Sequence, residues 1–203
     1  MNRFKTISLL VLATILLESC AGIPLMTAYK LRNLDPLTTD PANVRIAVIT
    51  DKSIELTDGS AVLELGFTAE NPELSLNDRY ETMISSHSDP RVISNKISAL
   101  GNNQHLILFE LSPTDARAMR SMQEKIEQYR QNEVQGNGSL SVSITSGCFE
   151  KDVPNALLVN VYLMFSEDQG YLPLLSNMDL FEEARKAGTL DKWLDCQEGE
   201  NQS

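Results

Sequence analysis

The stretch that decides the fold is residues 105–146, HLILFELSPTDARAMRSMQEKIEQYRQNEVQGNGSLSVSITS. It opens with a run, 105–111, that is apolar on both faces and therefore predicts a strand in the middle of a sheet. It closes on residues 139–146, where leucine, valine and isoleucine alternate with serine and threonine, a pattern typical of a half-buried strand. Between these strands the apolar spacing changes to that of a helix. The stretch therefore predicts a sheet with a long helix packed on it.

The helix is expected over residues 113–133. Ser112 is a good N-cap, and Pro113 suits the first helical position. The sequence 136–138, Gly-Asn-Gly, is expected to end the helix and turn the chain. The apolar stripe of the helix consists of Met119, Met122, Ile126 and Tyr129. The two methionines resemble a soft-metal pair, but methionines at helical spacing are far more often core residues, and we expect them in the core.

Working outward, strands are predicted at 44–50, at 61–69 and, in a central place, at 156–165. Residues 57–60 are expected to form a turn. The polar segment 70–90 is interpreted as mostly loop, with a short strand at 80–84, and 91–98 is a weak strand prediction. Residues 176–179 resemble a capping box before a helix that ends at Ala187, with Gly188 as its C-cap residue.

Strands, a helix, more strands and a second helix follow one another at spacings too short for most parallel crossovers. The predicted fold class is therefore α+β. We expect an antiparallel sheet or open sandwich of five to seven strands, one long helix (about 113–133) and a shorter C-terminal helix (about 177–187).

The composition is that of a globular chain of one domain, with 203 residues, 42% hydrophobic and 22% charged. The formal net charge of −11 argues against nucleic acid as a partner, because phosphate binding needs a basic surface. Residues 1–19 are interpreted as a signal peptide, 20–43 as a lipid-proximal connector, 44–196 as a single globular domain and 197–203 as a polar tail.

The first twenty residues, MNRFKTISLLVLATILLESC, decide the predicted compartment. Arg3 and Lys5 precede an apolar run at 7–17, which is shorter than the roughly 20 residues that span a bilayer. This order is typical of a secretory signal peptide. The alternative is that the run forms a buried helix of the mature fold.

The end of this run, residues 17–20 (Leu-Glu-Ser-Cys), resembles a bacterial lipobox. The resemblance implies cleavage before Cys20, acylation of Cys20 and a tether to a membrane; Glu18 departs from the pattern, where a small neutral residue is usual. Two or more acyl chains would anchor the protein stably. By the same resemblance, Ala21 favours the outer membrane. A rival cut after Ala21 would instead release a soluble periplasmic protein.

Cys148 and Cys196 remain once Cys20 carries lipid, and in an oxidising periplasm we expect them to form a disulfide. The alternative is a pair of buried thiols. A loop of this length is worth about 4 kcal/mol in the chain-entropy model. Trp193 is expected to pack beside this bridge, although it could also anchor a partner.

The search for catalytic and metal-binding motifs finds none of the common ones, so no cofactor, metal site or catalytic residue is predicted. His87 lies in a polar run, Ser-Ser-His-Ser-Asp, where a catalytic relay is conceivable but an exposed loop histidine is far commoner. His105 is expected to be a strand-edge residue rather than a metal ligand. The acidic residues Asp179, Glu182 and Glu183 fit the positive end of a helix dipole.

Several short pieces of the mature chain resemble uncharacterised small lipoproteins of alphaproteobacteria. These pieces are 35–37, 111–115 through 122–123, 147–148, and 171–174 through 179–180. The resemblance implies no activity, cofactor or catalytic residue.

The sequence therefore favours a membrane-tethered envelope lipoprotein that acts as a non-catalytic binding or assembly module in the periplasm. Its expected partners are the membrane, through the lipid, and an envelope protein or glycan. One alternative is a periplasmic hydrolase whose residues converge only in space, which requires a deep pocket with perturbed titratable groups. The other is a carrier of an apolar ligand, which requires a closed apolar cavity between sheet and helix.

Overall fold

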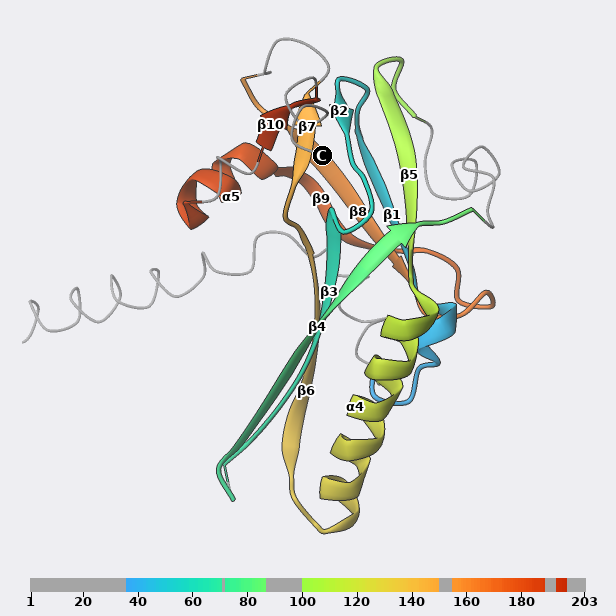
Figure 1. Ribbon diagram of the computed structural model, residues 1–203, viewed down its shortest axis with the longest axis vertical. Coiled ribbons are helices and arrows are strands. Elements are labelled where there is room, and N and C mark those ends of the chain that lie inside the picture. Colours follow the sequence, from blue (N-terminus) through green and yellow to red (C-terminus); the bar gives the residue numbers. More distant parts are fainter. Residues whose placement is uncertain (1–35, 71, 87–99, 150–154, 189–192, 197–203) are drawn as a thin grey trace, which may run out of the picture.

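A computed structural model describes residues 36–70, 72–86, 100–149, 155–188 and 193–196. A seven-stranded sheet runs in the order β6-β3-β4-β5-β1-β8-β9, and every pairing within it is antiparallel. Figure 1 shows this sheet strongly twisted and curled, with the helix α4 beside its lower half. The fold class expected from the sequence is thereby confirmed. The strands of the large sheet are β1 (Arg45–Asp51), β3 (Ala61–Ala69), β4 (Leu74–Ile84), β5 (Gln104–Leu111), β6 (Gly136–Ile144), β8 (Leu158–Met164) and β9 (Leu172–Asp179).

A second, three-stranded sheet has the order β10-β7-β2 and lies at the upper end of the molecule in Figure 1. Its strands are β2 (Ile54–Glu55), β7 (Gly147–Phe149) and β10 (Trp193–Asp195). The pairing of β10 with β7 is parallel, and that of β2 with β7 is antiparallel. The small sheet therefore holds the C-terminal strand against the segment that follows β6.

Strand β1 lies inside the large sheet between β5 and β8, because both of its faces are apolar. Ile46 and Val48 belong to the main core cluster, whereas Ala47 and Ile49 belong to a smaller cluster with Leu108 on the opposite face. Successive side chains of a strand point to opposite faces, so a strand that is covered on both sides needs apolar side chains on both. The predicted strand at 44–50 is confirmed, and so is the interior position of β5.

The short strand predicted at 80–84, within the polar segment 70–90 that is interpreted as mostly loop, is confirmed. It is longer than predicted, however: among the described residues of the segment, β4 begins already at Leu74. This strand pairs with β3 over Val62↔Glu81 to Ala69↔Leu74 and then with β5 over Thr82↔Leu111 to Ile84↔Phe109. Leu74, Leu76 and Tyr80 pack against the main core while the residues between them are mostly exposed. The strand reads as polar because only one of its faces is covered. The predicted strand at 91–98 lies outside the described residues.

Helix α4 (Pro113–Gln131) begins as expected, with the Ser112 side chain accepting a hydrogen bond from the backbone N–H of Asp115. Met119, Met122 and Ile126 are buried in the main core, and Tyr129 packs partly buried against it. The core position predicted for the two methionines is confirmed. Their helical spacing places them on one face of α4.

The end of α4 differs from the prediction. Helix geometry stops at Asn132, and Glu133 takes the left-handed conformation with φ of 63°. The Gly-Asn-Gly sequence is not the turn but the start of β6. Gly136 is needed there because a Cβ would lie 2.4 Å from the carbonyl oxygen of Thr68 and 2.5 Å from the ring of Phe67. The glycine marks a close approach of two strands rather than a helix end.

The C-terminal helix α5 (Leu180–Ala187) also starts later than predicted. Asp179, not Ser176, is its N-cap, and its carboxylate accepts hydrogen bonds from the N–H groups of Phe181 and Glu182. The residues of the supposed capping box instead finish strand β9, because they pair with β8 up to Leu158↔Asp179. Gly188 ends the helix with φ of 65°, as expected.

The part of the connector that the structure describes is packed on the domain. The short 3-10 helix η2 (Pro41–Asn43) contacts α4, and Leu37 is buried in the main core. The Gln123 side-chain amide donates hydrogen bonds of 2.8 Å to the carbonyl oxygens of both Pro36 and Thr39. The packed domain therefore includes residues from about 36, ahead of the boundary at 44 inferred from the sequence.

No helix among the described residues is both long and apolar enough to cross a bilayer.

Candidate functional site

The residue on which the predicted membrane tether depends, Cys20, lies outside the described residues, as do the signal segment 1–19 and His87. The geometry below therefore concerns the domain that Cys20 would carry.

The cysteine pair expected from the sequence is joined in the structure. Cys148 in β7 and Cys196, directly after β10, form a disulfide with an S–S distance of 2.10 Å across a separation of 48 residues. The parallel pairing of β7 with β10 sets Leu194 opposite Cys148 and brings the two cysteines together. Gly147 allows this approach, because a Cβ there would lie 2.7 Å from the Trp193 ring.

Aromatic rings pack beside the disulfide. The centroid of the Phe149 ring lies 5.2 Å from that of Phe181 and 6.2 Å from that of Trp193, and Phe181 meets Trp193 edge to face at 6.1 Å. All three side chains are buried. Trp193 therefore packs beside the bridge as expected, and the cluster joins α5 to the small sheet.

Glu55 of β2 lies next to the disulfide. A carboxylate oxygen of Glu55 and the sulfurs of Cys148 and Cys196 fall within 4.8 Å of one another, which is compact enough for a metal ion. Soft-metal binding needs thiolates, however, and disulfide sulfurs carry no such charge. We therefore do not expect Glu55, Cys148 and Cys196 to bind a metal ion together while the disulfide is intact.

An open groove of about 510 Å³ brings the two edge strands of the large sheet together. The edge strand β6 supplies one side, and the other edge strand β9, helix α5 and Trp193 supply the other. The groove is lined by Arg79, Val142, Ser143, Ile144, Thr145, Leu175, Met178, Leu180, Glu183, Ala184 and Trp193. Most of these side chains are apolar, which is the usual character of a ligand-binding cleft.

The charges at this groove are unbalanced. Glu183 accepts from Lys186 with a distance of 2.9 Å between the carboxylate oxygen and Nζ, so this acid already has a cation. Arg79, in contrast, makes no hydrogen bond or ion pair with any described residue. The groove therefore offers an apolar surface with one guanidinium that forms no ion pair with a described residue; Glu64 of β3 stands opposite Arg79 in the ladder without pairing with it.

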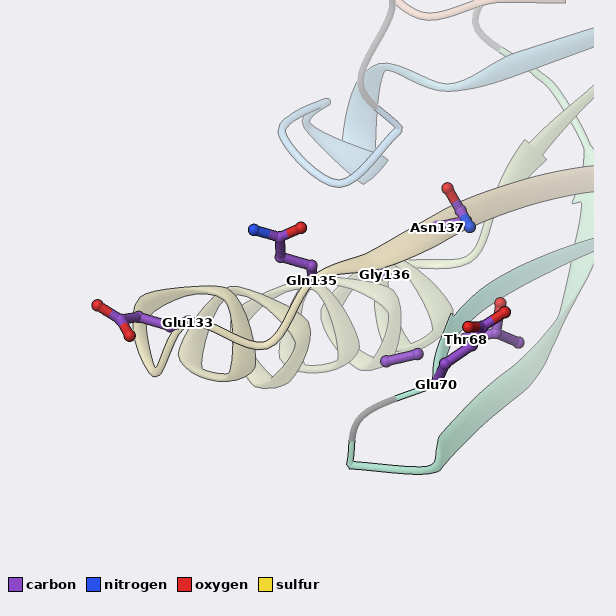
Figure 2. Close-up of a pocket in the computed structure, with 7 residues that line it drawn as sticks. Thr68, Glu70, Glu133, Gln135, Gly136 and Asn137 are labelled. Carbon is purple, nitrogen blue, oxygen red and sulfur yellow. The ribbon is translucent and has the colours of Figure 1, made fainter.

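A second, wider pocket of about 810 Å³ lies at the far end of the β3–β6 pairing, below the end of α4. Its lining is polar and includes Thr68, Glu70, Glu133 and Asn137. In Figure 2 the Glu133 carboxylate points away from Glu70 and Thr68, at the opposite side of the pocket. The two acids do not converge on one point, so the geometry supplies no acid–base pair.

A buried polar cluster lies on the face of β1 that carries Ala47 and Ile49. Arg45 Nε lies 3.1 Å from a carboxylate oxygen of Glu110, and the Ser85 hydroxyl donates to the same oxygen at 2.9 Å. Burial raises the pKa of the nearby Tyr171 phenol. The cluster joins β1, β5 and the end of β4. A buried carboxylate paired in this way needs no catalytic explanation.

The groups with perturbed pKa values are dispersed. A hydrogen bond from the backbone N–H of Ser53 lowers the pKa of Asp51, and burial raises the pKa of Tyr80. Hydrogen bonds to Glu183 and Glu182 raise the pKa of Lys186 on the exposed face of α5. None of these groups, nor Tyr171, lines either pocket described above. The observed shifts therefore do not mark a shared reaction centre.

The remaining candidates take structural positions. His105 is the second residue of the interior strand β5 and lies opposite Thr50 of β1, so it is near the end of its strand, as expected. Glu182 and Glu183 occupy the first turn of α5 behind the Asp179 cap.

No family model, curated protein or solved structure matches this chain. The geometry of the site must therefore carry the functional argument without a relative.

Sequence reasoning missed the groove. Of the elements that line it, only β6 and the C-terminal helix were predicted, whereas β9, β10 and the part of β4 that carries Arg79 were not. The groove exists because curling of the sheet brings residues 142–145 near residues 175–193, a proximity that no short motif encodes. The available signal was the apolar face of the predicted strand at 139–146, whose residues Leu140, Val142 and Ile144 are only partly buried.

Proposed function

We propose that this chain is a membrane-tethered lipoprotein of the cell envelope that acts as a non-catalytic binding module in the periplasm. The observation that carries the proposal is the pairing of the cysteines. The sequence has three, and the disulfide accounts for Cys148 and Cys196. The third, Cys20, lies just after the apolar run at 7–17, which has the length of a signal-peptide core, and acylation there would tether the domain.

The disulfide supports the compartment as well. Structural disulfides persist in oxidising environments such as the periplasm and are rare in the cytosol. The outer membrane is the favoured location, because Ala21 follows the lipid-bearing cysteine and, by the resemblance to bacterial lipoproteins, this residue favours that membrane. An envelope protein or glycan is the proposed class of partner. The open groove between β6 and β9 is the proposed place at which the tethered domain binds it.

The alternative of an apolar-ligand carrier draws support from the same groove, because most of its lining side chains are apolar. The groove is open, however, and lies between the sheet edges rather than enclosed between α4 and the sheet. The hydrolase alternative has less support, because the groups with perturbed pKa values do not line a common pocket among those described. Binding of a partner at the groove remains the better-supported function.

The test of the tether is the intact mass of the protein purified from bacterial membranes, with and without reductant. The expected mass corresponds to a chain that lacks residues 1–19 and carries acyl chains on Cys20. Reduction of the disulfide is expected to add the mass of two hydrogen atoms. A Cys20→Ser variant is expected to lose the acyl mass and to leave the membrane fraction. A full-length chain with Met1 and an unmodified Cys20 in the wild-type preparation would refute the proposal.

A further inference from the structure

The two edges of the large sheet differ in their protection. At one edge, β9 contains Pro173, and its register with β8 shifts between Val159 and Tyr162. Proline and irregular register are the usual devices that keep an edge strand from pairing with another chain. This edge is therefore blunted.

At the other edge, β6 has no such device. Its sequence, GNGSLSVSI, contains no charged residue and no proline, and it pairs with β3 over nine consecutive positions without a bulge. Within the described part of the chain β3 is its one partner strand. A long, regular and uncharged edge is the template that strand addition requires.

The hydrogen-bonding groups of this edge can be assigned from the ladder. The N–H of Thr145 donates to the carbonyl oxygen of Ser60, so the odd-numbered residues of the strand bond to β3. Because alternate residues of an antiparallel strand turn their N–H and C=O groups to opposite sides, Leu140, Val142 and Ile144 turn theirs to the open side. The last two of these residues also line the groove.

We propose that the groove binds an extended peptide segment of a partner protein, which pairs with the open edge of β6 as an added strand. This inference rests on the proposed function as a binding module and names the partner's chemistry. The segment places apolar side chains at alternate positions against Val142, Ile144, Met178 and Trp193. A carboxylate of the segment pairs with Arg79, which lines the groove and forms no ion pair with a described residue.

Charge favours a different protein over a second copy of this chain. The formal net charge of −11 makes two copies repel one another, and each copy would bring the same edge without a carboxylate on it. A partner segment with alternating apolar residues and one acidic residue would form backbone hydrogen bonds with the edge of β6 and an ion pair with Arg79. The added strand would occupy a cleft of about 510 Å³.

The test begins by selecting twelve-residue random peptides, displayed on phage, on the purified wild-type protein. The selected peptides are then synthesised with a fluorophore, and their dissociation constants are measured by anisotropy. We expect alternating apolar positions and an acidic residue. Arg79→Gln is expected to weaken binding about tenfold, as loss of a charge-assisted hydrogen bond predicts. Arg117→Gln, the same change of charge on α4, is the matched control and is expected to have no effect.

Amide hydrogen exchange by NMR locates the added strand. The amides of Leu140, Val142 and Ile144 are expected to exchange quickly in the free protein and slowly with peptide bound, whereas those of Ser141 and Ser143 are slow in both. N-methylation of alternate peptide amides is expected to abolish binding. Failure to select a peptide, or selected peptides that ignore Arg79 and leave the three amides unchanged, would overturn the proposal.

Two further outcomes would assign the edge to another occupant and equally overturn the proposal. Protection of the three amides in free, monomeric protein would mean that the chain covers its own edge. Concentration-dependent dimerisation, seen by sedimentation and weakened by Ser141→Lys, would mean that a second copy does. These results are separable from the tether, because peptide binding is measured on the protein whether or not Cys20 is acylated.

Discussion

At the scale of single residues, Gly136 shows most clearly how one position fixes the geometry of the sheet. It starts β6 opposite Ala69, where the strand passes against the backbone of Thr68 and the ring of Phe67. Any side chain must push apart two paired strands or displace a fully buried ring. Its role is steric, since its φ is not in the left-handed region.

We expect Gly136→Ala to lower the free energy of unfolding by about 2 kcal/mol or more, in the range of overpacked cores. Urea denaturation followed by tryptophan fluorescence would measure the change. Gly138→Ala is the matched control, because a Cβ there meets only the flexible side chain of Leu37, at 3.3 Å. Equal stability of the two variants would show that the close approach at Gly136 does not exist in solution.

At the scale of elements, helix α4 holds the beginning of the described chain in place. The buried Gln123 amide donates to the carbonyl oxygens of Pro36 and Thr39, and Arg120 pairs with Asp40 on the surface beside it. The exposed ion pair contributes little. The buried amide contributes more, because its loss leaves two carbonyl groups without their donor.

Gln123→Ala is therefore expected to cost about 1–3 kcal/mol of stability and to make the segment around residues 36–43 faster to cleave by protease. Limited proteolysis with mass spectrometry would locate the cuts. Arg120→Ala serves as the comparison and is expected to change both quantities much less. If the segment in Gln123→Ala were as resistant as in the wild type, the bonds to Pro36 and Thr39 would not be what holds it.

The elements also show what the sequence could predict. Alternation at 61–69 and 139–146 predicted β3 and β6, and the serine–proline pair at 112–113 predicted the start of α4. The first part of strand β4 escaped prediction because its few apolar side chains are separated by polar ones that face solvent. The cap of α5 was misplaced because Ser176 satisfies the local pattern, whereas pairing with β8 extends β9 as far as Asp179.

The candidate site was predicted only in part. The Cys148–Cys196 bridge followed from counting cysteines, and the position of Trp193 beside it followed from their nearness in sequence. The groove could not be predicted, because it depends on the curl of the whole sheet. Arg79 carried no signal either, since its lack of a partner is a property of three-dimensional packing.

At the scale of the whole molecule, the disulfide fastens the last strand to the rest of the fold. Reduction is expected to lower the free energy of unfolding by about 4 kcal/mol, the chain-entropy value for a loop of this length. Thermal unfolding with and without reductant would measure it, with the Cys148→Ser/Cys196→Ser variant as an independent comparison. An unchanged melting temperature in both cases would mean that the bridge constrains nothing in the unfolded chain.

The position of β1 has a consequence for the order of assembly. Among the strands of the large sheet, β1 is the first to leave the ribosome or a translocation channel. Its neighbours in the sheet, however, are the later strands β5 and β8. Its last partner residue, Met164, follows Arg45 by more than half the chain length. Strands with such distant partners form late. This strand, apolar on both faces, therefore waits without its partners during synthesis, and in that interval a holding chaperone would bind it.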